Sequence, residues 1–439
     1  MKKKTFRAAM VIINVCMLLM LSGPLLTPGF AAEKKAPKEI VLGQTWPLSG
    51  PFAWFGEECK RGVDIAVEIV NEAGGVYLKE YGKKLPVRLI TYDDAGDGNK
   101  MSTLATALIT VDKVDGIVGG GYYNIMWPLI ANIVSKHKIP ASTLWGGDMF
   151  KRGNKWIFSS IVPYEDYAAG PAWALRKVVD DKAIPENDKP RKIAVIADNS
   201  AFSGTCLEGF KKILKDHGGF QFVFEERVPF GLTDYSPQIL KLKRANADVI
   251  LLINPWTPDV LVFFKQVKEY DLNAKMWINA FAHNLPFVLD PLGKIADYVL
   301  TQAIWFKSIE YEGVICGDIK WSNADWIARS KKKGKEPFDW DLASGSGVFM
   351  ILDAMYQAGS LNKEAVRDKL ARTDMLTPRQ PIVIDPKTGL NTYSKSMAIQ
   401  VQNGVPQVVY PDYIQYKGKN WKSKTADIIY PTPEWSKRP

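Results

Sequence analysis

The chain has 439 residues, of which 46% are hydrophobic, and a formal net charge of +10. A single hydrophobic core stops growing at about 250–300 residues, so a chain of this length and composition is expected to fold as two lobes. Its basic residues form no stripe interleaved with aromatic residues, which argues against a nucleic-acid-binding protein. Three histidines and no Cys-x-x-Cys pair leave little material for a metal site or a histidine-assisted nucleophile.

The N-terminal residues have the composition of a secretory signal peptide. Basic residues lie only at positions 2, 3, 4 and 7, an apolar stretch follows over 8–21, and a site of small residues ends at Ala32. The apolar stretch is shorter than the roughly 20 residues that a spanning helix needs, although a membrane anchor stays open as the alternative. We therefore expect residues 1–32 to be removed on export to the periplasm, with no membrane insertion afterwards and a net charge of +6 on the remaining chain.

Strands and helices are expected to alternate along the first part of the remaining chain. Apolar residues at 55, 59, 63, 66 and 70 follow the spacing of one helix face, and Gly74-Gly75 ends that helix. The expected strands cover 39–46, 85–92, 115–119 and 139–143, and the expected helices cover 55–73, 100–111 and 125–137. Alternation of this kind is typical of βαβ units and a parallel sheet.

The same order then repeats. An apolar strand over 192–197 precedes a helix with apolar residues at 202, 206, 210 and 213, which ends at Gly218-Gly219. The motif F-x-x-x-C-x-x-G occurs in both halves, from Phe55 to Gly62 and from Phe202 to Gly209. The repeat predicts two lobes built on one plan, with each cysteine as a small buried residue on the core face of its helix. Whether Cys59, Cys206 and Cys316 form any disulfide stays open at this point.

In open parallel sheets, ligands bind beyond the C-terminal ends of the strands. Aromatic residues recur at these predicted ends, which lie in surface loops where large rings are not expected to be buried in the core. They are Trp54, Phe55, Tyr122, Tyr123, Trp145, Phe202, Trp256 and Phe281. The pattern predicts an aromatic cleft between two facing lobes.

Several segments resemble the branched-chain amino acid-binding protein family. They are Gln44–Gly62 with its Ser-Gly-Pro turn, Tyr92–Asp97, Asp166–Pro171, Gly334–Pro337, Val348–Ala358 and Ile384–Gly389. The resemblance is diffuse, but the order of the segments is specific, and it covers most of residues 39–410.

The resemblance implies an α/β fold of two doubly wound parallel-sheet lobes, like the type I periplasmic binding proteins, joined by three crossings. The crossings are expected near Ser159–Pro163, Thr301–Phe306 and Tyr393–Lys395. Lobe 1 would comprise residues 33–160 and 305–394, and lobe 2 residues 161–304 and 395–439. Such a protein closes around its ligand by hinge motion. The resemblance also implies a monomer that delivers the ligand to an ABC permease and its ATPases, without enzymatic activity, cofactor, metal or nucleic acid.

The residues that the resemblance implies for the site depart from the family pattern. The family holds an α-carboxylate at positions that fall near Tyr123-Asn124 and Trp145-Gly146, and its aromatic clamp falls at Phe55, Phe202 and Trp256. Its carboxylate for the α-ammonium falls at or near Ala280, where the chain has no acid. A buried ammonium without a counter-charge is costly.

We therefore expect a small apolar or aromatic carboxylate as the ligand. The expected ligand-binding residues are Trp54, Phe55, Tyr123, Asn124, Trp145, Gly146, Asp166, Phe202, Trp256 and Phe281. A branched-chain amino acid is the alternative, with Asp166 as counter-charge. A ligand-sensing module for a membrane receptor and an exported hydrolase are the other classes considered, and no G-x-S-x-G motif supports the hydrolase.

Overall fold

The computed structural model describes residues 36–119, 126–147, 150, 152–281, 283–393 and 395–438, without the side chains of 126–128. The expected signal peptide lies outside these residues. The helices and strands below belong to the unit Pro37–Pro439.

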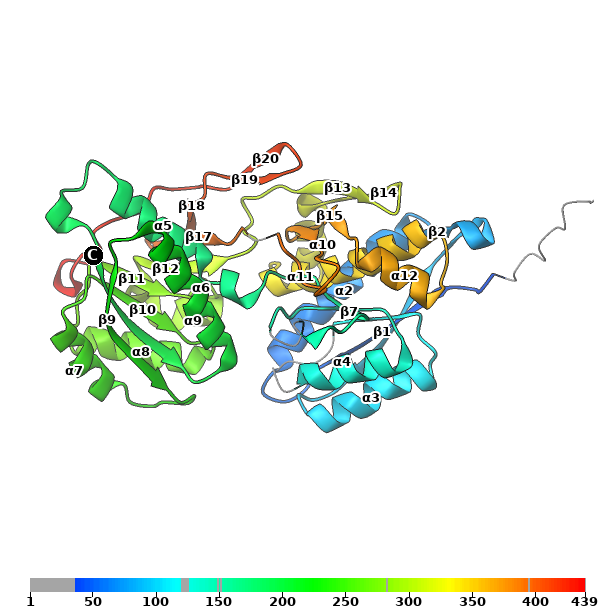
Figure 1. Cartoon of the computed structure of the whole chain (residues 1–439), viewed down its shortest axis with the longest axis horizontal. Helices are drawn as coiled ribbons and strands as arrows, with labels where there is room; N and C mark the ends of the chain where they lie inside the picture. The colour runs from blue at the N-terminus through cyan, green and yellow to red at the C-terminus, as the bar shows by residue number, and fades with distance from the viewer. Residues whose placement is uncertain are drawn as a thin grey trace, which may run out of the picture. The chain divides into compact units, whose positions relative to one another are not determined.

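The first sheet is parallel, with strand order β4-β1-β5-β6-β7. Its strands are β1 (Ile40–Trp46), β4 (Val87–Asp93), β5 (Gly116–Val118), β6 (Ala141–Thr143) and β7 (Ile157–Ser159). One face carries α3 (Gly98–Thr110) and α4 (Met126–His137), which pack on each other (Figure 1). The other face carries α2 (Ala53–Glu72) and α11 (Asp339–Ala358), and α11 contacts both β5 and β6.

The second sheet has the order β18-β17-β12-β11-β10-β8-β9. Its strands are β8 (Lys192–Asp198), β9 (Gln221–Val228), β10 (Val249–Ile253), β11 (Met276–Asn279), β12 (Val299–Ala303), β17 (Met397–Gln402) and β18 (Val405–Tyr410). The strands from β8 to β12 are parallel, whereas β17 and β18 add an antiparallel edge. The covering helices are α5 (Ala169–Asp180) and α6 (Ala201–His217) on one face, and α7 (Ser236–Ala245), α8 (Thr257–Glu269) and α9 (Pro286–Leu292) on the other.

Both sheets follow one plan. Numbered along the chain within each half, the parallel strands lie in the order 2-1-3-4-5, as in doubly wound folds. The prediction of an α/β fold with two doubly wound parallel sheets is confirmed. In β8, Ile193 and Val195 pack under α5 and α6, whereas Ala194 and Ile196 pack under α7 and α8. This alternation explains why the strand reads as a continuous apolar run: it is buried on both faces.

The repeated motif has the same structural role in each half. Cys59 and Cys206 are free and buried, as expected for small core residues. A Cβ atom on Gly62 would lie 1.8 Å from the carbonyl oxygen of Asp341, and one on Gly209 would lie 1.9 Å from that of Glu165. Each glycine therefore allows another backbone segment to pack directly on its helix. That segment is the start of α11 in the first half and η3 (Tyr164–Asp166) in the second.

The described chain passes between the two sheets three times. It leaves the first sheet after Ser159, leaves the second after Ala303, and re-enters the second at Met397. Between the last two passages lie α10 (Asn323–Lys332), α11, α12 (Lys363–Leu370) and the hairpin-like pairs β13–β14 (Glu312–Ile315, Ile319–Ser322) and β15–β16 (Asp374–Leu376, Pro381–Val383). The exact lobe boundaries stay a prediction.

The C-terminal tail contacts elements of both halves. Its hairpin, β19 (Tyr413–Tyr416) and β20 (Lys419–Lys422), lies on the β13–β16 side, where the Tyr416 hydroxyl donates to Asp374 at 2.5 Å. The tail then returns to the second sheet, where the Trp435 indole N–H donates to the carbonyl of Leu272 at 2.7 Å. The sequence offered no reason for this tail, and these contacts show it to be an ordered part of the fold.

Candidate functional site

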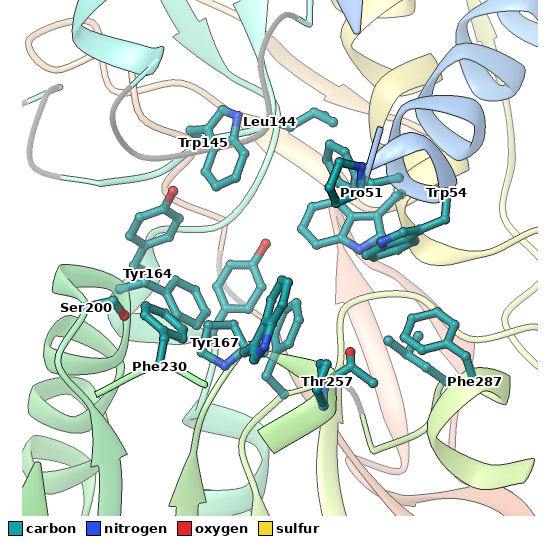
Figure 2. Close-up of a pocket in the computed structure, with 18 of the residues that line it drawn as sticks. Pro51, Trp54, Leu144, Trp145, Tyr164, Tyr167, Ser200, Phe230, Thr257 and Phe287 are labelled. Carbon is teal, nitrogen blue, oxygen red and sulfur yellow. The ribbon is translucent and has the colours of Figure 1, made fainter. Parts of the chain in front are cut away.

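A cavity of about 560 Å³ lies at the C-terminal ends of the parallel strands of both sheets (Figure 2). Of the residues that the structure describes, those that line it are Pro51, Trp54, Phe55, Leu144, Trp145, Ile161, Tyr164, Tyr167, Ser200, Phe202, Phe230, Pro255, Trp256, Thr257, Pro258, Leu261, Phe281, Leu285, Phe287 and Trp340. Eleven of these twenty described residues are aromatic. The volume falls within the range of roughly 300–1,000 Å³ that is typical of small-molecule sites.

One wall comes from loops and helices of the first half. Trp54 and Phe55 lie in the first turn of α2, Leu144 and Trp145 follow β6, and Trp340 is the second residue of α11. The Phe55 and Trp340 rings meet edge to face with centroids 5.4 Å apart. The close approach of α11 to Gly62 sets this contact, because Asp341 follows Trp340 directly.

The opposite wall repeats this construction. Phe202 lies in the first turn of α6, and its ring meets Tyr164 edge to face with centroids 5.0 Å apart. Gly209 lets η3 approach α6, which places Tyr164 and Tyr167 at the cavity. The phenylalanine of each repeated motif thus contacts an aromatic residue on the segment that the glycine of the same motif admits.

Aromatic rings from the two halves also meet. Phe281 follows β11, and its ring centroid lies 6.4 Å from that of Trp340. The ring centroids of Trp54 and Phe287 lie 5.0 Å apart. Trp54 and Phe287 are 37% and 40% exposed, so large apolar surface faces solvent beside the cavity. Exposed aromatic surface next to a pocket is typical of a ligand-binding cleft.

The polar groups of the described wall are few. None of its described residues carries a charged side chain, and its hydroxyl groups belong to Ser200, Thr257, Tyr164 and Tyr167. The Ser200 hydroxyl accepts from the backbone N–H of Ser203 and so caps α6. Burial raises the pKa of Tyr167 to about 12, so its phenol stays protonated at neutral pH.

Helix N-termini supply the main positive field at the cavity. The first turns of α2, α6, α8 and α11 all contribute lining residues. A helix N-terminus carries a partial positive charge equivalent to about half an elementary charge. The first turns of α8 and α11 already carry acidic residues, so the field that favours an anionic group comes from α2 and α6, whose first turns carry none.

The expected site residues have different positions in the structure. Trp54, Phe55, Trp145, Phe202, Trp256 and Phe281 line the cavity. Gly146 is buried directly behind it, where its carbonyl accepts from the Tyr164 N–H at 3.3 Å, and Asp166 is half-buried on η3, outside the lining set. Tyr123 and Asn124 lie outside the described residues.

The sequence reasoning did not identify several lining residues, including Tyr164, Tyr167, Phe287 and Trp340. Tyr164 and Tyr167 could have been found from the expected first crossing, because a hinge segment borders any cleft between lobes. Trp340 had no local signal, since its place depends on α11 packing against α2 nearly 300 residues away.

Other chemistry finds no support in the described part of the chain. No group of three or more potential metal ligands occurs there, and no described helix is long and apolar enough to cross a membrane. His283 is fully buried, and its Nε2 lies 3.1 Å from the carbonyl oxygen of Ala296. Burial lowers the pKa of His283 to about 4, so this histidine is a neutral structural residue.

Comparison with known proteins agrees with this architecture. The family model for periplasmic binding proteins matches residues 39–404. Leu/Ile/Val-binding protein homolog 7 of Brucella abortus is 27% identical over 389 residues, which is 87% of this chain and 94% of that protein.

Two solved structures share the fold and differ in ligand. The branched-chain amino acid transporter substrate binding protein of Streptococcus pneumoniae, in complex with isoleucine, has a TM-score of 0.67 at 16% identity and covers 85% of this chain and 100% of its own. A solute binding protein of an ABC transporter from R. palustris, in complex with 4-hydroxybenzoate, has a TM-score of 0.63 at 20% identity. The match covers 91% of this chain and 99% of that protein.

The match of the family model and the full-length relatives settle the class of protein, and this class binds solutes without being an enzyme. The chain belongs to the periplasmic binding protein family, as a substrate-binding protein of the branched-chain amino acid ABC transporter type.

Proposed function

We propose that the chain captures a small apolar or aromatic carboxylate in the aromatic cleft by hinge closure and delivers it to an ABC permease and its ATPases from the periplasm. The observation that carries the proposal is the wall itself: eleven of its twenty described residues are aromatic and none of the twenty is charged. An aromatic ring is complementary to such a wall because offset and edge-to-face ring pairs contribute about 0.5–1.5 kcal/mol beyond the area they bury.

A free amino acid fits the described wall less well. Its ammonium group would need a carboxylate partner, since burial of an unpaired charge is strongly unfavourable. The backbone position of that carboxylate in the family falls near Ala280, which is buried and apolar here. A carboxylate group, in contrast, is favoured by the N-termini of α2 and α6, whose first turns carry no acidic residue. The structural relative bound to 4-hydroxybenzoate shows that this fold accommodates an aromatic acid.

Isothermal titration of residues 33–439 with benzoate, 4-hydroxybenzoate, leucine and isoleucine tests the proposal. We expect an aromatic acid to bind at least about tenfold more tightly than either amino acid. Tight leucine binding with no response to the aromatic acids would refute the proposal. In that case Asp166→Asn is the decisive variant, because Asp166 lies between Tyr164 and Tyr167, which both line the cavity.

A matched pair of variants places the ligand in the cleft. Trp256→Ala removes a lining ring, whereas Trp173→Ala removes a ring that is 39% exposed on α5, outside the lining set. We expect the first variant to weaken aromatic-acid binding by tenfold or more and the second to leave it unchanged. Equal affinities of the two variants would show that the ligand binds elsewhere.

A further inference from the structure

A buried polar cluster lies directly behind the aromatic wall. Arg379, which follows β15, is fully buried, and its Nε and Nη2 atoms donate to Asp339 at 2.9 and 2.6 Å. The guanidinium carbon lies 5.8 Å from the ring centre of Trp340, which lines the cavity. The cluster is therefore separated from the cavity by a single layer of side chains.

Tyr167 connects this cluster to the cavity. It lines the cavity from the second half, and its side chain is 1% exposed. The Arg379 guanidinium lies near enough to oppose the rise that burial causes in the pKa of Tyr167. Charged groups in the cluster thus act on a hydroxyl of the wall itself.

Nη1 of Arg379 and Oη of Tyr167 meet the distance and angle limits of a hydrogen bond with none of the described residues, but the two side chains lie close enough for a hydrogen bond between them to lower the pKa of Tyr167 and raise that of Arg379. A buried polar group without a partner costs about 1–3 kcal/mol. Asp339 accepts from Nε and Nη2 of the guanidinium, so Nη1 is not part of this bidentate pair. A hydrogen bond from Arg379 to Tyr167 would use a lone pair of the hydroxyl oxygen and leave the tyrosine hydrogen for another acceptor.

The chemistry of these atoms defines that partner. Arginine has only donors, and a protonated tyrosine beside it offers its hydrogen to whatever accepts it. Figure 2 shows the hydroxyl end of Tyr167 directed toward the side of the cavity that carries Trp145 and Pro51. The partner of the Tyr167 hydrogen is therefore an acceptor oxygen on a ligand in the cavity, which an ammonium group does not supply.

We propose that Tyr167 and Arg379 form the polar end of the site: Tyr167 donates to the carboxylate of the bound ligand, and Arg379 is a positioning residue that holds Tyr167. This inference rests on the proposed function and adds the residues that select acids. Since the Tyr167 hydroxyl is covered in this structure, contact with a ligand requires neighbouring side chains to move.

Titrations with benzoate and benzyl alcohol test the inference, because the two probes share a ring and differ in the anionic group. We expect Tyr167→Phe to weaken benzoate binding by about ten- to a hundredfold, as for a hydrogen bond to a charged group, and to change benzyl alcohol binding by less than about threefold. Arg379→Lys should lower the benzoate preference in the same direction. Tyr311→Phe, at a tyrosine that is likewise 1% exposed and lies outside the cavity, is the control and should behave as wild type.

The outcomes separate this inference from the proposed function. If the wild-type protein binds benzoate and Tyr167→Phe binds it equally well, the acid-selecting role is wrong and the proposed function stands. If Tyr167→Phe weakens both probes equally, the residue contributes only to the shape of the wall, and the inference is again overturned. If the wild-type protein binds no aromatic carboxylate at all, the proposed function fails and takes this inference with it.

Discussion

The repeated glycines make a sharp prediction about how the cleft is built. Gly209 lies in the middle of α6, and the Cβ atom of an alanine there would lie 1.9 Å from the carbonyl oxygen of Glu165. An ordinary contact between these atoms needs about 3.5 Å, so η3 would have to move by roughly 1.5 Å. Because the obstacle is backbone and not the end of a flexible side chain, no rotamer change can relieve the clash.

The same helix offers a matched control at Gly204. A Cβ atom there would meet nothing closer than the Arg227 guanidinium at 3.5 Å. Replacing a helical glycine by alanine without a clash stabilises a protein by up to about 1 kcal/mol. Gly204→Ala should therefore be as stable as the wild type or more so. Gly209→Ala makes the same helix-propensity gain but adds an overpacking cost of about 1–3 kcal/mol or more.

Urea denaturation of the two variants measures the difference directly. We expect Gly209→Ala to be less stable than Gly204→Ala by about 1–3 kcal/mol, the overpacking cost alone, because both variants make the same helix-propensity gain. Because η3 carries Tyr164 and leads to Tyr167, Gly209→Ala should also weaken aromatic-acid binding while Gly204→Ala does not. Equal stability of the two variants would refute the idea that Gly209 is required for the approach of η3.

Three further predictions concern stability. Arg61→Met leaves the fully buried Asp341 carboxylate without the guanidinium that donates to it at 2.8 Å. The free energy of unfolding at pH 7, measured in urea titrations, should therefore fall by about 3 kcal/mol or more, and a loss below about 1 kcal/mol would contradict a stabilising role for this ion pair. Burial raises the pKa of Asp94 to about 6, so the folded protein holds this proton more tightly than the unfolded chain and loses stability as pH rises from about 4 to 6. Asp94→Asn should remove this dependence of the unfolding free energy on pH, which is at most about 1.4 kcal/mol per pH unit, and should be more stable than the wild type at pH 7. An unchanged pH profile would show that the pKa of the Asp94 carboxyl is not raised. Trp435→Ala removes a half-buried ring and its hydrogen bond to the carbonyl of Leu272. The free energy of unfolding should fall by about 2 kcal/mol, less than the roughly 3–5 kcal/mol expected for a fully buried tryptophan. No change would show that this ring does not hold the tail in place.

Much of the architecture could be predicted because parallel α/β folds leave few choices. Strands that are buried on both faces appear as apolar runs, and their connections must return through helices, so the order of elements follows from periodicity alone. The same topology fixes where ligands bind. Trp54 was identified only as a residue that follows a strand, whereas Phe202 and Trp256 were also implied by the family resemblance, and all three line the cavity.

The rest of the site could not be predicted from local pattern. Trp340 and Arg379 are far in sequence from the end of any parallel strand. Their positions follow from helix packing and from a loop conformation. Asp166 illustrates the opposite case. Its place in the sequence suggested a counter-charge in the cleft, but it lies on a short 3₁₀ turn whose flanking tyrosines line the cavity while it does not. The direction of a side chain on such a turn depends on which face packs on α6, and the sequence does not specify that face.

The duplicated motif explains why both walls of this cleft are aromatic. In each half, a glycine on the helix that follows the first strand admits a backbone segment. The phenylalanine two turns earlier packs on the aromatic residue that the segment carries: Phe55 on Trp340, and Phe202 on Tyr164. The two admitted segments differ, since one begins a long helix and the other follows a passage between the sheets. Hinge motion that changes the passage must therefore move Tyr164 and Tyr167 with it, while Trp340 stays fixed to the first sheet through α11. Opening and closing would then change the distance between one rigid aromatic wall and one that is tied to the hinge, which couples ligand contact to lobe movement without any further device.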